Sequence, residues 1–145
     1  MRLSSRTRYG MRAMLELAVE YGRGPVQIKT IAERENISNK YLEQLVAALK
    51  GSGFLRSLRG PRGGYVLDRP PEEINLLDIF TTLEGPMLAV DCLEHPEFCP
   101  RCSDCATRLI WSQLKQAIEG VLEGITLKDL SDRCMSIREN KDYQI

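Results

Sequence analysis

The chain has 145 residues, 43% of them hydrophobic and 28% charged, and its 20 Lys and Arg residues balance its 20 Asp and Glu residues. This length suits one domain, or one small domain with an appended dimerisation arm. The charged start argues against a signal peptide, and no segment approaches the ~20 apolar residues of a membrane span, so we expect a cytoplasmic protein without a membrane partner.

The two halves of the chain carry opposite charge. Residues 1–69 hold 13 Lys and Arg against 6 Asp and Glu, a net charge of +7, and residues 70–145 hold 7 against 14, a net charge of −7. A basic half can contact phosphates while an acidic half stays away from them, so this asymmetry favours a nucleic-acid partner for the first half. Chance segregation of charge is the alternative interpretation.

The first helix is expected over residues 5–22. Ser4 or Ser5 is a suitable N-cap, and Gly22 ends the helix. Apolar residues recur in this segment at the spacing of an amphipathic helix, and the predicted apolar face consists of Met11, Met14, Leu15, Ala18 and Val19.

Two short helices across a tight turn are expected next. The first spans residues 28–35, Asn36 supports the turn, and Ser38 is a good N-cap for a second helix over residues 39–50. The second helix is expected to bury one face and to leave Lys40, Glu43, Gln44 and Ala47 pointing outward; the buried face consists of Leu42, Leu45, Val46 and Leu49. This pattern predicts a helix-turn-helix, with an ordinary helical hairpin as the alternative.

A β-hairpin with a basic tip is expected after these helices. Residues 54–58 and 65–67 read as strands, and the glycines and proline of the segment RGPRGG between them exclude a helix. A hairpin in this position is the wing of a winged helix. Arg59 and Arg62 at its tip suit a narrow minor groove, and a solvated basic turn is the alternative.

Three further segments complete the chain. A short helix over residues 76–83, capped by Asn75, is followed by an irregular loop over residues 86–103. Ser103 or Asp104 is expected to cap a helix of ~30 Å that ends near residue 123. Its apolar stripe consists of Ile110, Leu114, Ala117, Ile118 and Val121. Thr126 and Asp129 form a capping-box-like start for a last helix over residues 127–138.

The fold class expected is mainly α: a winged helix-turn-helix with a two-stranded β wing and a long C-terminal dimerisation helix. We divide the chain into a winged helix-turn-helix domain over residues 1–69, a short helix with a cysteine-rich loop over 70–103, and the dimerisation and C-terminal helices over 104–145.

Four cysteines crowd into the loop segment CLEHPEFCPRCSDC: Cys92, Cys99, Cys102 and Cys105. In a reducing cytosol such a group favours metal ligands or redox thiols over structural disulfides. The last three reproduce three spacings of a ferredoxin-type ligand run, but Leu109 stands at the fourth position. Spacing alone leaves an iron–sulfur cluster, zinc and redox thiols open. Cys134 stands apart and is expected to be a small buried hydrophobe.

The segments MRLSSRTRYGMRAM, ISNKYLEQL and RGPRGGY, with a cysteine loop ending in Cys-x5-Trp, closely resemble the Rrf2 family of winged-helix transcription factors, and within it the iron–sulfur cluster regulators. The resemblance covers the chain from Met1 to about Leu130. It implies a homodimer with crossing C-terminal helices. It also implies a [2Fe–2S] cluster that senses iron–sulfur status and alters which promoters are bound.

The resemblance also assigns cluster ligands. Cys92, Cys99 and Cys105 correspond by position to the family's three cysteine ligands, but Arg108 stands where the family has a histidine as the fourth. Relatives that sense nitric oxide take an aspartate from the partner subunit instead, at the position of Arg8 here. We therefore expect Cys102 as the fourth ligand. His95, here expected on the surface, is the weaker candidate, and an exogenous ligand is a further alternative.

The expected partner is double-stranded operator DNA. Glu43 would accept a hydrogen bond from cytosine, Gln44 would pair with adenine, and Lys40 would contact phosphate or base. Arg59 would enter the minor groove. The full expected set of contacts is Arg2, Arg6, Arg8, Ser38, Asn39, Lys40, Tyr41, Glu43, Gln44, Arg59 and Arg62.

Two rival functions remain open. One is a cluster-free winged-helix repressor whose cysteine loop binds zinc or acts as a thiol switch, as in a family member that regulates cysteine metabolism and lacks a cluster. The other is an iron–sulfur carrier or scaffold, which would have no use for a wing or a basic face. An enzyme is not expected, because the sequence has no Ser–His–Asp set, P-loop or Rossmann fingerprint.

Overall fold

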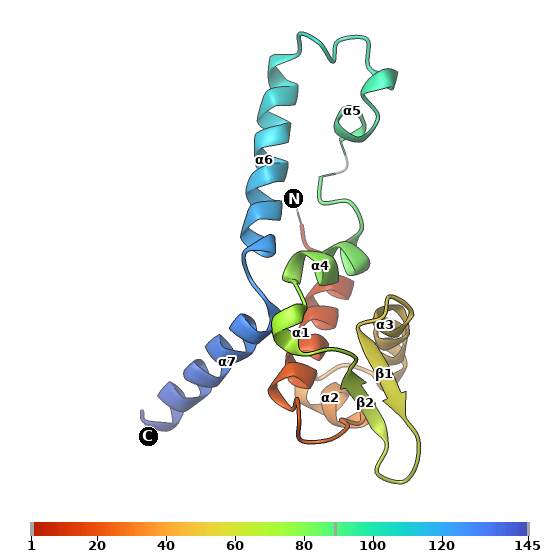
Figure 1. Ribbon diagram of the computed structural model, residues 1–145, viewed down its shortest axis with the longest axis vertical. Coiled ribbons are helices and arrows are strands. Elements are labelled where there is room, and N and C mark those ends of the chain that lie inside the picture. The colour runs from red at the N-terminus through yellow and green to blue at the C-terminus, as the bar shows by residue number, and fades with distance from the viewer. Residues whose placement is uncertain (1, 89, 145) are drawn as a thin grey trace.

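The computed structural model describes residues 2–88 and 90–144. Helices α1 (Ser5–Val19), α2 (Ile28–Glu35) and α3 (Asn39–Gly51) pack together, and the hairpin of β1 (Leu55–Leu58) and β2 (Gly64–Leu67) lies beside them (Figure 1). This is the mainly helical winged helix-turn-helix that the sequence predicts. Within the described residues, no helix is long and apolar enough to cross a membrane.

Helix α1 is the centre of the fold. It is capped by Ser4, whose hydroxyl accepts a hydrogen bond from the N–H of Thr7, and it ends at Val19 rather than near Gly22. The predicted apolar face is wrong in part: Met14 and Ala18 are buried, but Met11, Leu15 and Val19 are only partly buried, whereas Ala13 and Leu17 lie in the core. The reason is that α1 packs against α2, α3, α4 and α7, so burial extends around most of the helix.

The helix-turn-helix forms as expected. Asn36 adopts the left-handed conformation, with φ of 53°, at the C-cap of α2. Ser38 caps α3 by accepting a hydrogen bond from the N–H of Tyr41. The predicted core face of α3 is buried: Leu42, Leu45, Val46 and Leu49 are each at most 1% exposed. Burying this face leaves the opposite face of α3 to solvent.

The wing is fastened to the body of the domain at its root. Leu55 pairs with Leu67 and Leu58 with Gly64 in the antiparallel hairpin. Beside it, Val26 and Tyr65 exchange backbone hydrogen bonds of 2.9 and 2.8 Å. A Cβ atom at Gly64 would lie 2.5 Å from the carbonyl oxygen of Val26, so this close approach requires glycine.

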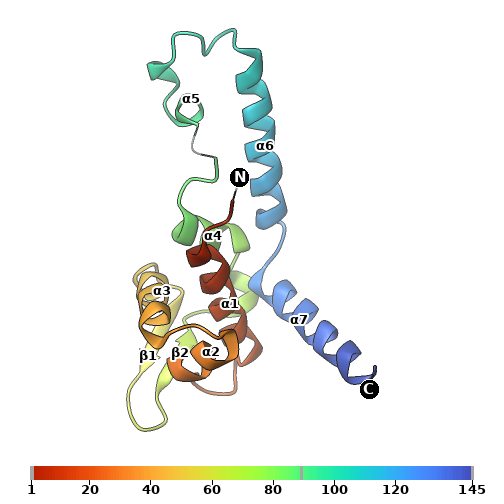
Figure 2. The same ribbon diagram turned by 180° about the vertical axis from the view of Figure 1, so that it is seen from behind.

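Helices α4 (Leu76–Glu84) and α7 (Leu127–Asp142) extend the same core. Asn75 caps α4, and Thr126 and Asp129 form the predicted capping box of α7. Ile74, Ile79 and Leu127 are fully buried, and α4 packs against α1 and α3. Helix α7 continues to Asp142, beyond the predicted end at residue 138, and its far end points away from the core (Figures 1 and 2).

Helix α6 (Ala106–Glu123) forms an arm that carries the cysteine loop at its far end (Figure 2). Its N-cap is Cys105 rather than Ser103 or Asp104, because the helix begins later than predicted. The loop is also less irregular than expected, since it contains the short helix α5 (Asp91–Glu94) and a 3-10 turn over Pro96–Phe98. Another 3-10 turn, Pro71–Glu73, precedes α4.

Candidate DNA-binding face and cysteine loop

The exposed face of α3 carries the predicted recognition residues. Lys40, Glu43, Gln44 and Ala47 are exposed, and Ser38 and Asn39 are exposed at the start of the helix. They share one face because the other face fills the core. The polar side chains on this face supply hydrogen-bond donors and acceptors of the kind that read base edges in a major groove.

Tyr41 differs from these residues because it is half-buried. Its ring meets the ring of Tyr9 on α1 edge to face, with the centroids 6.1 Å apart. The guanidinium groups of Arg8 and Arg12 lie 5.8 and 5.6 Å from the Tyr9 ring centre. Through Tyr9, these contacts place two arginines of α1 near the start of α3, an arrangement that the sequence alone does not reveal.

The remaining predicted arginines lie in different surroundings. Arg59 and Arg62 are exposed at the wing tip, where Gly60 has a φ of 113°. Arg2 is also exposed. Arg6 is exposed too, but its Nε donates a 3.1 Å hydrogen bond to the carbonyl of Leu83 at the end of α4. Arg6 therefore has a structural contact in addition to any contact with phosphate.

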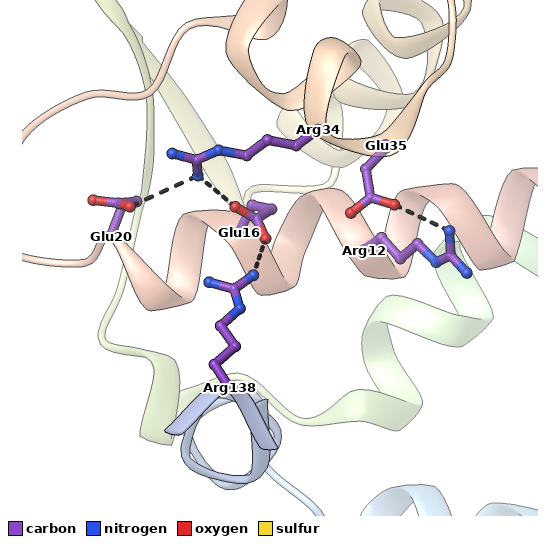
Figure 3. Close-up of polar contacts among 6 residues, drawn as sticks. All are labelled: Arg12, Glu16, Glu20, Arg34, Glu35 and Arg138. Carbon is purple, nitrogen blue, oxygen red and sulfur yellow. Dashed lines mark hydrogen bonds and ion pairs between the residues drawn. The ribbon is translucent and has the colours of Figure 1, made fainter. Parts of the chain in front are cut away.

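The buried carboxylate of Glu16 on α1 joins α2 and α7 to α1 (Figure 3). Glu16, whose side chain is 4% exposed, accepts hydrogen bonds of 2.6 Å from Arg34 on α2 and from Arg138 on α7. Arg34 also reaches Glu20 at 3.7 Å, and Arg12 pairs with Glu35 at 3.1 Å. The hydrogen bond to Glu16 raises the pKa of Arg138. The sequence does not reveal this cluster, because a glutamate within an amphipathic helix gives no sign of burial.

The four loop cysteines are free thiols with partly exposed side chains, and so is Cys134, which was predicted to be buried. Cys102 donates a 3.7 Å hydrogen bond from its thiol to the carbonyl of Cys92. Arg108 donates to the same carbonyl at 3.1 Å. The predicted substitute ligand and the arginine at the family's histidine position therefore both contact the backbone of Cys92.

Two of the thiols have shifted acidities for different reasons. Partial burial raises the pKa of Cys102, and the neighbouring Cys99 thiol adds to the rise. The hydroxyl of Thr107, at 3.2 Å, lowers the pKa of Cys105, and the backbone N–H groups at the start of α6 act in the same direction. Cys105 is therefore the thiol of this pair that more readily becomes a thiolate.

His95 lies on the surface of the cysteine loop. Its Nδ1 lies 3.3 Å from a carboxylate oxygen of Glu97, its side chain is 57% exposed, and its ring lies 5.5 Å from that of Phe98. The expectation that His95 is a surface residue agrees with this position.

The donor set fits a soft metal centre by its chemistry, since four thiols share one short loop beside a helix N-terminus. Within residues 2–88 and 90–144, no three His, Cys, Asp or Glu side chains converge on one point where a metal ion would sit. Cys92, Cys99, Cys102 and Cys105 are therefore named as candidate ligands by residue type and by their position in the loop, without a coordination geometry.

Comparison with known proteins gives consistent results. The family model Rrf2, described as an iron-dependent transcriptional regulator, matches residues 3–133. The HTH-type transcriptional regulator IscR of Serratia proteamaculans is 37% identical, over 98% of this chain and 88% of its own. Its name and the family description are those of a transcriptional regulator and not of an enzyme.

Two solved structures agree with this result. The structure of CymR, the global cysteine regulator of B. subtilis, is 40% identical and covers 92% of this chain and 98% of its own, with a TM-score of 0.79. IscR of T. potens is 36% identical and covers 100% and 92%, with a TM-score of 0.75. Because the family model spans most of the sequence and these relatives match over nearly their whole length, the chain belongs to the Rrf2 family of transcriptional regulators.

Proposed function

We propose that this chain is a homodimeric DNA-binding transcriptional regulator controlled by a [2Fe–2S] cluster, sensing iron–sulfur or redox status in the cytoplasm. The observation that carries the proposal is the loop of four free thiols at the end of an arm that begins at the winged helix. The family description as an iron-dependent regulator supports the same function.

The proposed DNA contacts follow from the exposed surfaces. The α3 face would enter the major groove, with Glu43 and Gln44 reading base edges and Lys40 contacting phosphate or base. Arg59 would enter the minor groove. The other contacts of the proposed set lie near these: Ser38, Asn39 and Tyr41 at the start of α3, Arg62 on the wing, and Arg2, Arg6 and Arg8 at the N-terminus.

The proposed dimer forms through α6. Every residue of this helix is at least partly exposed, yet it carries large apolar side chains: Leu109, Ile110, Trp111, Leu114 and Val121 are 39–64% exposed. An apolar groove of about 400 Å³ continues this surface onto α1 and α4, where Met11, Leu15 and Phe80 line it. An apolar stripe on an 18-residue helix is the kind of surface that a second copy buries.

The proposed cluster ligands are Cys92, Cys99, Cys105 and, as the fourth, Cys102. The cluster, when bound, would supply a redox-active centre whose loss or oxidation is the signal. The chain's own residues prepare the thiols: Thr107 and the start of α6 favour the thiolate of Cys105, and Arg108 fixes the carbonyl of Cys92.

A cluster-free regulator with a zinc or thiol-switch loop is the second candidate. It is favoured by the similarity to the B. subtilis global cysteine regulator, which matches this chain as well as the IscR structure does. An iron–sulfur carrier or scaffold is the third, and the exposed recognition face argues against it because that task has no use for such a face.

The test is a visible absorption spectrum of anaerobically purified protein, with iron and sulfide analysis, combined with DNA binding before and after cluster removal. Charge-transfer bands with equal iron and sulfide, and an affinity that changes when they are lost, are expected. A colourless protein with bound zinc, or DNA affinity that depends only on thiol oxidation, would favour the second candidate. A coloured protein that binds no DNA would favour the carrier.

A further inference from the structure

The end of α4 and the start of α1 cap one another. The Glu84 carboxylate accepts hydrogen bonds from the backbone N–H of Ser4 at 3.3 Å and from its hydroxyl at 2.7 Å, and it also accepts one from the hydroxyl of Thr7. In return, Arg6 on α1 donates to the carbonyl of Leu83. Thr7 is buried at 2% exposure, and Ser4 and Glu84 are partly buried, so the junction is partly shielded from solvent.

The junction is also tightly packed. A Cβ atom at Gly10 would lie 2.6 Å from a methyl carbon of Leu83, so the two helices meet with almost no space between them. Tight packing of this kind transmits a displacement of one helix to the other, because a close-packed contact has no free volume to absorb it.

Glu84 stands at the point where the cysteine loop begins. Gly85, the next residue, has φ of 86° and ψ of −153°, a backbone conformation that favours glycine, and the loop leaves α4 through this turn. The far side of the loop returns to α6, which packs against α4. The last residue of α4 is therefore directly connected to the start of the loop.

The other side of the junction leads to the DNA-binding face. Ser4 caps α1 and Thr7 lies in its first turn. The next residues are Arg8 and Tyr9, and Tyr9 packs against Tyr41 of α3. Tyr9, which contacts α3, thus lies only two residues after Thr7, which holds Glu84.

We propose that Glu84 is a positioning residue that couples the state of the cysteine loop to DNA affinity, by holding the start of α1 through Ser4 and Thr7. The inference rests on the proposed control of DNA binding by a cluster in that loop, and it names the contact through which the control acts. Glu84 itself touches neither DNA nor cluster in this scheme.

The test compares full-length wild type with Glu84→Gln and with Asp78→Asn, a matched loss of charge at an exposed position of the same helix. Each protein is titrated with one DNA duplex selected from a random pool by the wild-type protein, first with the cluster reconstituted and then after its removal. The quantity compared is the ratio of the two affinities, because a purely structural defect weakens both states alike and leaves the ratio unchanged.

For the wild type and Asp78→Asn we expect a ratio of roughly 5–150-fold, the usual range of coupling between two sites, and for Glu84→Gln a ratio below about twofold. The pair Thr7→Val and Thr7→Ser repeats the test if Glu84→Gln folds poorly: the valine variant should lose the ratio and the serine variant should keep it. A wild-type ratio near one would overturn the proposed function together with the inference. A wild-type ratio that persists in Glu84→Gln and Thr7→Val would overturn only the inference.

Discussion

Glu16 on α1 and Arg138 on α7 lie 122 positions apart, yet the Glu16 carboxylate accepts a 2.6 Å hydrogen bond from the Arg138 guanidinium. The other oxygen of the same carboxylate accepts one from Arg34 on α2. One buried side chain therefore joins the first helix of the helix-turn-helix to the last helix of the chain (Figure 3).

Glu16→Gln should destabilise the fold by about 2 kcal/mol or more, because it weakens two charge-assisted hydrogen bonds and removes the buried carboxylate that two arginines share. Urea unfolding followed by circular dichroism measures this loss. Glu35→Gln is the matched control, since its partner Arg12 is 55% exposed, and it should cost less than about 1 kcal/mol. Equal losses in the two variants would contradict the role assigned to Glu16.

Gln44→Ala should relax base preference at one position of the operator, with a cost of roughly 1–3 kcal/mol at the contacted base pair. Binding to a panel of single-base operator variants measures it. Arg2→Ala, at an exposed N-terminal position, should instead weaken all sequences alike and reduce the salt dependence of binding. If Gln44→Ala leaves the ranking of the panel unchanged, the recognition face has been assigned wrongly.

Ile110→Glu should convert the dimer into a monomer, because it places a charge in the apolar stripe of α6, where Ile110 is 51% exposed in the single chain. Sedimentation at micromolar concentration measures the change, and DNA affinity should fall because paired half-sites ~34 Å apart require two linked subunits. Gln113→Glu, on the same helix at an exposed polar position, should remain a dimer. A wild-type protein that is monomeric and binds DNA fully would refute the proposed interface.

Cys102→Ala should shift the visible spectrum and shorten the lifetime of the cluster in air, because Cys102 is the proposed fourth ligand. Cys134→Ala, which removes a thiol on α7 away from the loop, should change neither. A wild-type spectrum and lifetime in Cys102→Ala would exclude Cys102. Loss in His95→Ala would then move the assignment to that residue, and loss in neither variant would indicate an exogenous or partner-chain ligand.

The stabilising effect of Glu84 should depend on pH. The hydroxyls of Thr7 and Ser4 lower the pKa of this carboxyl in the folded chain, so the contribution is complete above the unfolded value of about 4.3 and is lost as the pH falls through the lower folded value. The difference in unfolding free energy between wild type and Glu84→Gln should therefore narrow below about pH 4. A difference that stays constant on acidification would contradict this assignment.

Local signals predicted most of the elements correctly. Ser38, Asn75 and Thr126 mark helix starts because a side chain caps the backbone within three residues, a relation written in the sequence itself. The exposed face of α3 could be predicted equally well, because the helix buries only one face and its apolar residues mark it. Helix α1 shows where periodicity fails, because a helix packed on several sides has no single apolar stripe.

The contacts that the sequence did not reveal are long-range. Glu84 meets Ser4 across 80 positions. The sequence marks Ser4 as a candidate N-cap but gives no sign of its partner at the end of α4. The start of α6 was predicted too early for a local reason. Ser103 and Asp104 have better capping side chains than Cys105, but residues 99–104 form hydrogen-bonded turns, so the helix begins only after Cys105. The positions of the four thiols relative to one another likewise depend on α5 and the Pro96–Phe98 turn, which spacing alone did not predict.

The β-bridge between Val26 and Tyr65 has a consequence for how such a protein changes in evolution. Backbone hydrogen bonds fix the base of the hairpin to the segment before α2. The length and charge of the hairpin tip can therefore vary without any change in core packing. Residues added or exchanged around Pro61 would alter the surface of the proposed minor-groove contact, while Gly64 keeps the paired strands in register. A change in this one exposed turn could therefore alter the proposed DNA specificity while the rest of the domain keeps its fold.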